Sequence, residues 1–244
     1  MWRDKKVSVI FPTYNEKDSI RAAIEDFFAC EYVDEIVVVN NNAAEGTDAE
    51  VEGTGARLVY EEAQGYGHAI WKGLDEATGD LLVIAEPDGT FSGNDVYKLL
   101  AYSHDVPVVF GTRTSQQFVW EGANMGIVLK FGNWGVGKLM EFLFNTTILT
   151  DVGCSMRLLN REVYEDIRGQ FTVGGSAFGP QLMLLVILNG YVFTEIPVNY
   201  KKRVGESSVT GSLPRAVLLG IEMALMIVRY RVLSWVGVLP RKQD

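Results

Sequence analysis

Short apolar runs alternate, along the first half of the chain, with segments in which apolar residues recur every three or four positions. The runs are typical of buried strands, and the three-to-four spacing is typical of helices that cover them. Strands are predicted at residues 7–11, 35–39, 57–60, 81–85 and 106–110, and helices at 18–28 and 67–77. This alternation favours an α/β fold, a mostly parallel sheet with helices on both faces. Pro12 is expected to end the first strand.

The second half of the chain shows weaker patterns. Residues 120–150 are rich in glycine and aromatic residues and favour helices, and residues 191–200 predict a late strand that Pro197 interrupts. Residues 213–238 are apolar over long stretches, but charged side chains interrupt them. Their apolar run 223–228 is far shorter than the roughly 20 residues that a transmembrane helix requires.

We therefore expect residues 213–238 to form one or two amphipathic helices on or near a membrane surface. A helix buried within the fold is the alternative interpretation. The predicted organisation is a main domain, residues 1–212, followed by a membrane-associating helical segment, residues 213–244.

Charge is distributed unevenly. Residues 200–244 carry eight lysines and arginines and three acids, a net of +5, which leaves −14 on the rest of a chain whose net charge is −9. An acidic main domain is a poor partner for nucleic acid, because phosphate contacts dominate that affinity. A basic and apolar C-terminal segment is typical of segments that meet anionic lipid head groups, although a packing helix with charged ends has the same composition.

The two cysteines, Cys30 and Cys154, have no metal-ligand spacing, and the charged N-terminal residues lead directly into a predicted strand. These features favour a reduced cytoplasmic protein without a signal peptide. We expect it to be peripheral on the inner face of the cell membrane.

The most informative stretch is residues 82–90, in which four apolar residues are followed by Glu86 and Asp88. Ligands of open parallel sheets bind outside the carboxyl ends of the strands, where these two carboxylates are predicted to lie. Hard oxygen ligands suit Mg²⁺ or Mn²⁺, and such cations usually share their coordination with substrate phosphates. A solvated turn at the end of a strand is the alternative interpretation.

Three further strand ends carry polar or glycine-rich loops. Residues 11–16 offer Tyr14 as a stacking surface and Glu16 as an acceptor for a ribose or a base. Residues 40–42 are three asparagines whose amides can read the edge of a base. Residues 64–69 contain glycines that allow a ligand to approach the backbone, at a helix start that favours anions. Each loop alone could be an ordinary turn, but together they predict a nucleotide site at one edge of the sheet.

Five segments resemble those of the inverting GT-A glycosyltransferases of family 2, and specifically the dolichyl-phosphate mannose synthase branch. The similar segments, in the family's order, are residues 7–16, 35–47, 65–80, 151–158 and 190–210. The resemblance implies a Rossmann-like GT-A fold with the C-terminal amphipathic helices as an addition.

The resemblance also implies roles for individual residues. Nucleotide-sugar binding is expected from Pro12, Tyr14, Glu16, Asn40, Asn41, Gly65, Gly67, Glu86 and Asp88. Metal binding is expected from Glu86, Asp88 and Thr90, and binding of an acceptor phosphate from Arg113, Lys130, Arg203 and Ser207. The expected catalytic residues are Asp88, Asp151 and Arg113, and Arg157 belongs to the same acceptor-side motif as Asp151.

Several positions depart from the family pattern. Asn40 and Glu86 stand where the family usually has aspartates, Thr90 stands where glutamine is common, and Gln181 lies near a position that is often glutamate. Glutamate at position 86 keeps the charge that a metal requires. Asn40 lacks a carboxylate, so that a GDP-sugar and a UDP-sugar both remain open as donors.

The leading hypothesis is a metal-dependent transfer of a hexose from a GDP- or UDP-sugar to a polyprenyl phosphate at the cytoplasmic membrane face. The oxygen of such an acceptor is already anionic and needs no strong base, whereas a hydroxyl acceptor would need one, for which Asp151 is the candidate. The alternatives are a family 2 glycosyltransferase acting on a glycan or a small soluble acceptor, and a non-catalytic nucleotide-sugar-binding protein.

Overall fold

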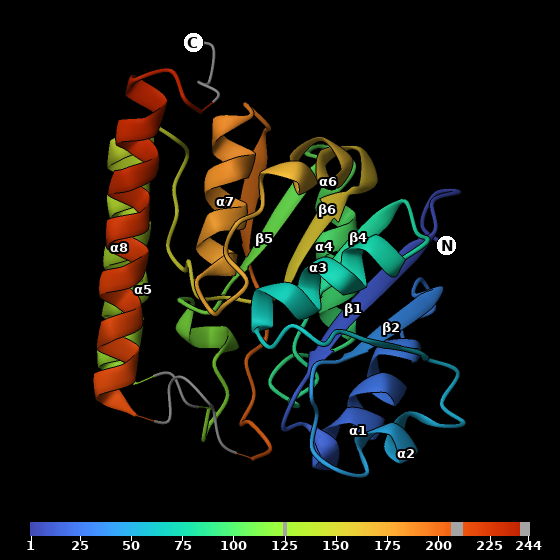
Figure 1. Cartoon of the computed structure of the whole chain (residues 1–244). Coiled ribbons are helices and arrows are strands. Elements are labelled where there is room, and N and C mark those ends of the chain that lie inside the picture. Colours follow the sequence, from blue (N-terminus) through green and yellow to red (C-terminus); the bar gives the residue numbers. More distant parts are fainter. Residues whose placement is uncertain (124–125, 206–211, 240–244) are drawn as a thin grey trace.

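The computed structural model describes residues 1–123, 126–205 and 212–239. A seven-stranded sheet forms its centre, with the strand order β3-β2-β1-β4-β6-β5-β7 (Figure 1). Every pairing is parallel except the two made by β6. The strands are β1 (Val7–Thr13), β2 (Glu35–Asn40), β3 (Arg57–Tyr60), β4 (Leu81–Ile84), β5 (Val108–Thr112), β6 (Arg157–Asn160) and β7 (Phe193–Pro197).

Helices cover both faces of this sheet, as the apolar pattern predicted (Figure 1). They are α1 (Lys17–Phe28), α2 (Thr47–Val51), α3 (Tyr66–Glu76), α4 (Asn94–Tyr102), α5 (Ile127–Phe144), α6 (Arg161–Ile167), α7 (Phe178–Leu188) and α8 (Leu213–Trp235), with 3₁₀ turns η1 (Gln116–Phe118) and η2 (Arg168–Gln170). Because side chains of a strand alternate between faces, the central strands contribute to two separate apolar clusters. Ile10 belongs to one cluster with residues of α3, α7 and α8, whereas Val9 belongs to the other with residues of α1 and α4. The predicted fold class is confirmed.

The prediction that Pro12 ends the first strand is wrong, because β1 continues to Thr13. The neighbouring strand β4 pairs with β1 only as far as Ile10, and from there β1 continues against β2 alone. The missing N–H of Pro12 therefore falls on the side where no ladder remains, which is where a strand tolerates proline.

Most other differences lie after β4. The strand expected at 106–110 begins two residues later, and β6, α4, α6 and α7 were not predicted. Strand β6 contains only two apolar residues, flanked by Arg157 and Asn160, so it lacks the apolar run that identified the other strands. Helix α7 is buried on almost every side, so its sequence lacks the one-sided apolar spacing that identifies a surface helix.

Most of the segment predicted at 213–238 forms one long helix, α8, which lies beside α5, while α7 separates this pair from the sheet (Figure 1). Met223, Ile227 and Tyr230 of α8 are buried in the same apolar cluster as α7. The division of the chain at residue 212 stays a prediction. Within the described residues, no helix has both the length and the apolar character needed to cross a membrane.

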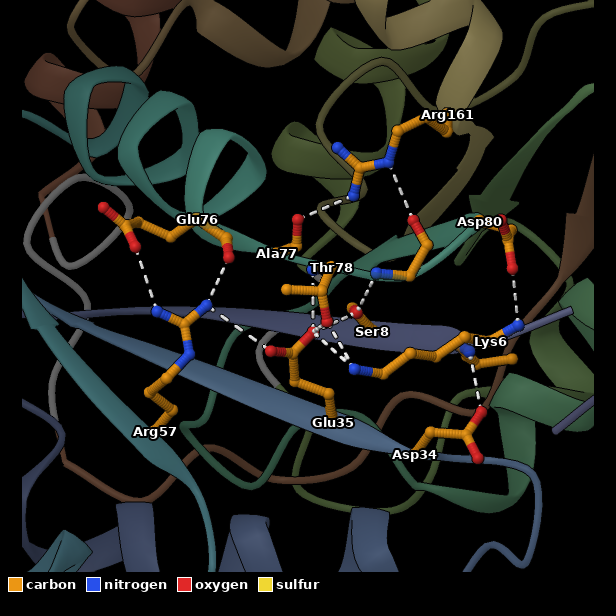
Figure 2. Close-up of polar contacts among 12 residues, drawn as sticks. Lys6, Ser8, Asp34, Glu35, Arg57, Glu76, Ala77, Thr78, Asp80 and Arg161 are labelled. Carbon is orange, nitrogen blue, oxygen red and sulfur yellow. Dashed lines mark hydrogen bonds and ion pairs between the residues drawn. The ribbon is translucent and has the colours of Figure 1, made fainter.

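At the amino ends of the parallel strands, Glu35 is the centre of a polar network (Figure 2). Its carboxylate accepts hydrogen bonds from Ser8 Oγ at 2.5 Å and from the backbone and hydroxyl of Thr78, both at 2.9 Å. Arg57 and Lys6 lie 3.4 and 3.8 Å from its oxygens. Burial alone would raise the pKa of Glu35, but the hydrogen bonds from Ser8 and Thr78 outweigh burial and lower that pKa.

The turn between α3 and β4 completes this network. Arg161 donates to the carbonyls of Ala77 and Gly79 at 2.7 and 2.8 Å (Figure 2). A Cβ at Gly79 would lie 2.6 Å from Ser8 Oγ, so the turn requires glycine at this position. The amino end of the sheet is therefore closed by groups that already have partners.

Candidate active site

A cavity of about 700 Å³ opens at the other edge of the sheet, outside the carboxyl ends of β1 and β4. One end of the cavity is polar and is lined by Glu16, Glu86, Arg113, Arg157 and Arg203. The other end lies among α5, α7 and α8 and is mostly apolar, with Leu129, Val136, Leu182, Val217 and Met223 in its walls. The strand-end loops singled out in the sequence thus border one cavity.

Glu86 and Asp88 lie together at the polar end, and Arg203 reaches both. Its Nη2 is 2.6 Å from Glu86 Oε2 and 2.5 Å from Asp88 Oδ2, while its Nη1 is 4.0 Å from Glu16 Oε1. Asp88 is fully buried, whereas Glu86 lines the cavity. One guanidinium thus faces three carboxylates.

Asp88 has one buried oxygen without a hydrogen bond among the described residues. Its Oδ1 accepts from the backbone and hydroxyl of Thr90 at 2.8 and 2.5 Å. Its Oδ2 has an ion-pair contact with Arg203 but no hydrogen bond of acceptable geometry within the described structure. Burial and the neighbouring charge of Glu86 raise the pKa of Asp88 to about 7.

These residues fit a divalent cation in part. Glu86 and Asp88 supply hard oxygen donors, and Asp88 Oδ2 is buried without a hydrogen bond, as a metal ligand would be. In the described parts of the chain, no group of three or more histidine, cysteine, aspartate or glutamate side chains could hold a metal by itself. A cation held by Glu86 and Asp88 would need further ligands, such as diphosphate oxygens or water. Thr90 is buried and donates to Asp88, and it does not line the cavity.

Pro12, Tyr14 and Glu16 line the cavity from the end of β1. Glu16 Oε2 accepts from the backbone N–H groups of Tyr14 and Asn15 at 2.7 and 2.9 Å. The carboxylate therefore fixes the loop, and its Oε1 is the oxygen that faces Arg203. Tyr14 is 45% exposed, which leaves its ring available to stack on a base.

The asparagines at the end of β2 already have partners within the protein. Asn40 donates to Asp48 Oδ1 at 2.6 Å and accepts from the backbone of Ala43 at 2.8 Å. Asn41 donates to two carbonyls and accepts from the backbone of Gly65 at 2.8 Å. Asn41 lines the cavity, whereas Asn40 does not. Their role in reading a base stays a prediction.

Gly65 and Gly67 pack against the chain itself. A Cβ at either position would lie 2.3 Å from a backbone oxygen, that of Gly174 for Gly65 and that of Val173 for Gly67. Gly65 also has a φ of +151°, which only glycine adopts readily. The two glycines thus let the loop before α7 close over the start of α3, and Gly65 lines the cavity.

Arg113 and Asp151 form a buried pair. Arg113 donates to the two oxygens of Asp151 at 2.8 and 2.9 Å, and its guanidinium lies 5.0 Å from the ring centre of Tyr200. Arg113 lines the cavity, whereas Asp151 does not. The expected acceptor-side residues are therefore brought together, with the carboxylate occupied by the arginine.

Of the other two residues expected at an acceptor phosphate, the structure describes only Lys130. Lys130 follows the cavity residue Leu129 on α5 but does not itself line the cavity in the described structure. Ser207 lies outside the described residues.

Sequence reasoning missed Tyr66 and Ser155 and left Arg157 without a role. Tyr66 and Ser155 line the same cavity as Glu86. Arg157 donates to the carbonyls of Cys154 and Val152, both at 2.8 Å, and to that of Gly179. Tyr66 lies between Gly65 and Gly67 at the start of α3, a position that could have drawn attention to it.

The sequence is similar to those of two hexose transferases. The chain is 28% identical over 205 residues to a dolichyl-phosphate hexose transferase of Haloferax volcanii, covering 83% of this chain and 86% of that protein. It is 24% identical over 212 residues to the low-salt glycan biosynthesis hexosyltransferase Agl6 of the same organism, covering 83% of this chain and 49% of that protein.

The fold is also that of a solved enzyme. Glucosyl-3-phosphoglycerate synthase from Mycobacterium tuberculosis, in complex with Mn²⁺, UDP and phosphoglyceric acid, superposes with a TM-score of 0.71 at 17% identity, covering 96% of this chain and 80% of that chain. Residues 8–168, which include β1 to β6 and both strand-end carboxylates, match the family described as Glycosyl transferase family 2. With most of its length matched, the chain belongs to glycosyl transferase family 2.

Proposed function

We propose that this glycosyltransferase moves a hexose from a GDP- or UDP-sugar to a polyprenyl phosphate, with Mg²⁺ or Mn²⁺, at a membrane surface. The observation that carries this proposal is the continuity of the cavity. Its wall runs from Glu86 and Arg203 to the apolar side chains of α5, α7 and α8. A lipid phosphate has the matching division into an anionic head and an apolar chain.

The polar end suits a nucleotide diphosphate. Tyr14 offers a stacking surface beside Pro12, and Glu86 and Asp88 would hold the cation. When bound, the cation neutralises the diphosphate leaving group. In the solved relative, Mn²⁺ and UDP occur together in one complex, which supports this assignment.

The acceptor end suits a phosphate rather than a neutral hydroxyl. A hydroxyl acceptor needs a base, and both oxygens of Asp151 accept hydrogen bonds from Arg113. A phosphate oxygen is already anionic, so the chain must supply only cations and orientation. Arg113 and Arg203 line the cavity and are the candidates. The name of the Haloferax relative, a dolichyl-phosphate hexose transferase, supports the same substrate class.

Helix α8 supports a membrane surface as the place of reaction. Leu218, Ile221, Leu225, Val228 and Val232 recur at helical spacing and are between 44% and 66% exposed. They lie opposite the buried stripe of Met223, Ile227 and Tyr230, so packing against α5 and α7 does not explain them. On the neighbouring helix, Phe131 and Phe142 are 66% and 83% exposed. Exposed apolar surface of this kind marks an interaction site, and a lipid surface is the partner that a lipid substrate requires.

The proposal is tested by offering the protein Mn²⁺, radiolabelled UDP-glucose or GDP-mannose, and dolichyl phosphate in detergent, and counting label in the organic extract. We expect label that disappears with EDTA and with Asp88→Asn. Asp105→Asn, which removes an exposed carboxylate in the turn after α4, is the matched control and should retain transfer. The same donors offered with 3-phosphoglycerate test a soluble acceptor. Label only in the water-soluble product would overturn the lipid acceptor.

A further inference from the structure

Arg203 occupies an unusual position for an arginine proposed to bind an acceptor phosphate. Its side chain is 19% exposed, and its guanidinium contacts Glu86, Asp88 and, at longer range, Glu16. No bound phosphate is needed to hold it there, because the strand-end carboxylates supply its charge partners. With three carboxylates and one guanidinium, the cluster still has an excess of negative charge.

The backbone on both sides of Arg203 is anchored independently of that side chain. The N–H of Lys201 donates to the carbonyl of Thr90 at 2.8 Å, and the N–H of Val204 donates to the carbonyl of Asp88 at 2.9 Å. Residues 201–204 therefore run along residues 88–90, and we refer to them as the strap. Because the strap is fixed by its backbone, the guanidinium can change partners by rotation of its own side chain.

Arg203 and a divalent cation compete for the same oxygens. The guanidinium lies at ion-pair distance from Glu86 Oε2 and Asp88 Oδ2, the carboxylates assigned to the cation. A cation bound between them would leave Arg203 without its partners and beside a newly introduced positive charge. The planar guanidinium is suited to hold phosphate oxygens instead, through two parallel hydrogen bonds.

We infer that Arg203 is an exchangeable counter-ion, which neutralises Glu86 and Asp88 in the free protein and transfers to a phosphate of the bound ligand when the divalent cation enters. This inference rests on the proposed function, since it takes Glu86 and Asp88 as the metal ligands. It adds that cation binding at this site depends on the presence of a phosphate ligand. The cation binds weakly until a phosphate ligand receives the displaced arginine, so cation and nucleotide bind cooperatively.

The exchange is tested by titrating Mn²⁺ into the protein and measuring free Mn²⁺ by electron paramagnetic resonance, with and without UDP or GDP. The variants are Arg203→Gln, Arg203→Lys and the control Lys202→Gln, which removes an exposed positive charge from the adjacent residue of the strap. Without nucleotide, we expect Arg203→Gln to bind Mn²⁺ about tenfold more tightly, since an opposite charge at this range shifts carboxylate proton affinity by one to three pKa units. Lys202→Gln should stay within about twofold, as expected for an exposed charge.

Measurements with nucleotide distinguish an Arg203 that moves to a ligand phosphate from an Arg203 that only repels the cation. In the wild type, UDP or GDP should tighten Mn²⁺ binding strongly, and in Arg203→Gln this tightening should be about tenfold smaller, since the ligand phosphate loses its arginine. Arg203→Lys keeps the charge without the planar guanidinium and should give intermediate values. Equal Mn²⁺ affinities in all variants, or an unchanged effect of the nucleotide, would overturn the exchange while leaving the transfer activity to be judged by its own assay. A wild type that binds no Mn²⁺ would overturn both.

Discussion

The two ends of the central sheet both carry carboxylates, but these carboxylates differ in their hydrogen-bond partners. At the amino end, Glu35 is held by Ser8 and Thr78 and paired with Arg57 and Lys6 (Figure 2). At the carboxyl end, Asp88 is fully buried, yet one of its oxygens lacks a hydrogen bond among the described residues.

The pKa values follow the same division. Hydrogen bonds lower the pKa of Glu35 despite burial, whereas burial and the charge of Glu86 raise the pKa of Asp88 to about 7. A carboxylate therefore has hydrogen-bond partners for its oxygens at the amino end, whereas at the carboxyl end, where the binding site is proposed, one carboxylate oxygen lacks a hydrogen bond among the described residues.

The largest expected effect is a loss of activity without a loss of stability when Asp88, at the carboxyl end of the sheet, is changed. Asp88→Asn should lower sugar transfer on the order of 100-fold or more, the usual effect of removing one electrostatic contact to developing charge. In EDTA it should not lower the melting temperature, because the amide replaces a buried and poorly paired carboxylate. Transfer rates and thermal unfolding of the purified variant measure both. A variant that unfolds at a clearly lower temperature would mean that Asp88 supports the fold.

The matching change at the amino end should have the opposite result. Glu35→Ala removes the acceptor of several hydrogen bonds and should lower the free energy of unfolding by on the order of 2 kcal/mol. The specific activity of the folded fraction should not change. Urea denaturation is the measurement, and Glu50→Ala, which breaks an exposed pair with Arg21, is the control, with an expected loss below about 1 kcal/mol. A loss as small as that of the control would make the network incidental to stability.

The two ends should also respond to pH with opposite slopes. The pKa of Glu35 is lowered in the folded state, so its contribution to stability is present above the usual value of 4.5 and is lost as pH falls through the folded value. The pKa of Asp88 is raised from 3.8 to about 7, so without metal its effect on stability becomes less favourable as pH rises through that range. Unfolding in EDTA at several pH values should show Asp88→Asn losing the second slope and Glu35→Gln losing the first. Identical slopes in both variants would contradict the comparison.

The smallest effect on stability is expected on a surface that belongs to neither end. Leu225→Gln changes an exposed position of α8 and should alter the free energy of unfolding by less than about 0.5 kcal/mol. Its sedimentation with anionic phospholipid vesicles should nevertheless fall, because the proposed apolar contact is weakened. Met223→Gln on the buried face of the same helix should instead destabilise the protein. Unchanged vesicle binding in Leu225→Gln would remove α8 from the membrane contact.

The sequence predicted those parts of the site that depend on local pattern. The run before Glu86 identified a buried strand and placed two carboxylates at its end, because strand burial and strand direction are both readable from neighbouring residues. The contact between Arg203 and Glu86 joins residues 117 positions apart, and no local pattern encodes it. The family resemblance indicated that Arg203 matters, but not that it contacts the carboxylates.

The same limit applies to the fold. The strands of the first half, with helices α1 and α3, were recognised because each has its own apolar spacing, whereas α2 and α4 were not predicted. Strand β6 was missed because its few residues become a strand through pairing with β4 and β5, and both of these strands lie far from β6 in sequence. The internal hydrogen bonds of Asn40 and Asn41 were equally invisible, since their partners lie on other loops.

The reversed direction of β6 has a consequence for how relatives of this chain can diverge. Because β5 and β6 are antiparallel neighbours, β5 ends and β6 begins at the same edge of the sheet. Residues 113–156, with α5 among them, are therefore a single excursion that departs from the sheet and returns to it. The ion pair between Arg113 and Asp151 joins the start of this excursion to its returning end. Such an excursion can be lengthened, shortened or exchanged between proteins without altering β1 or β4, the strands that precede Tyr14 and Glu86. A graft of residues 114–150 between family members is thus a rational way to change the acceptor while keeping the donor.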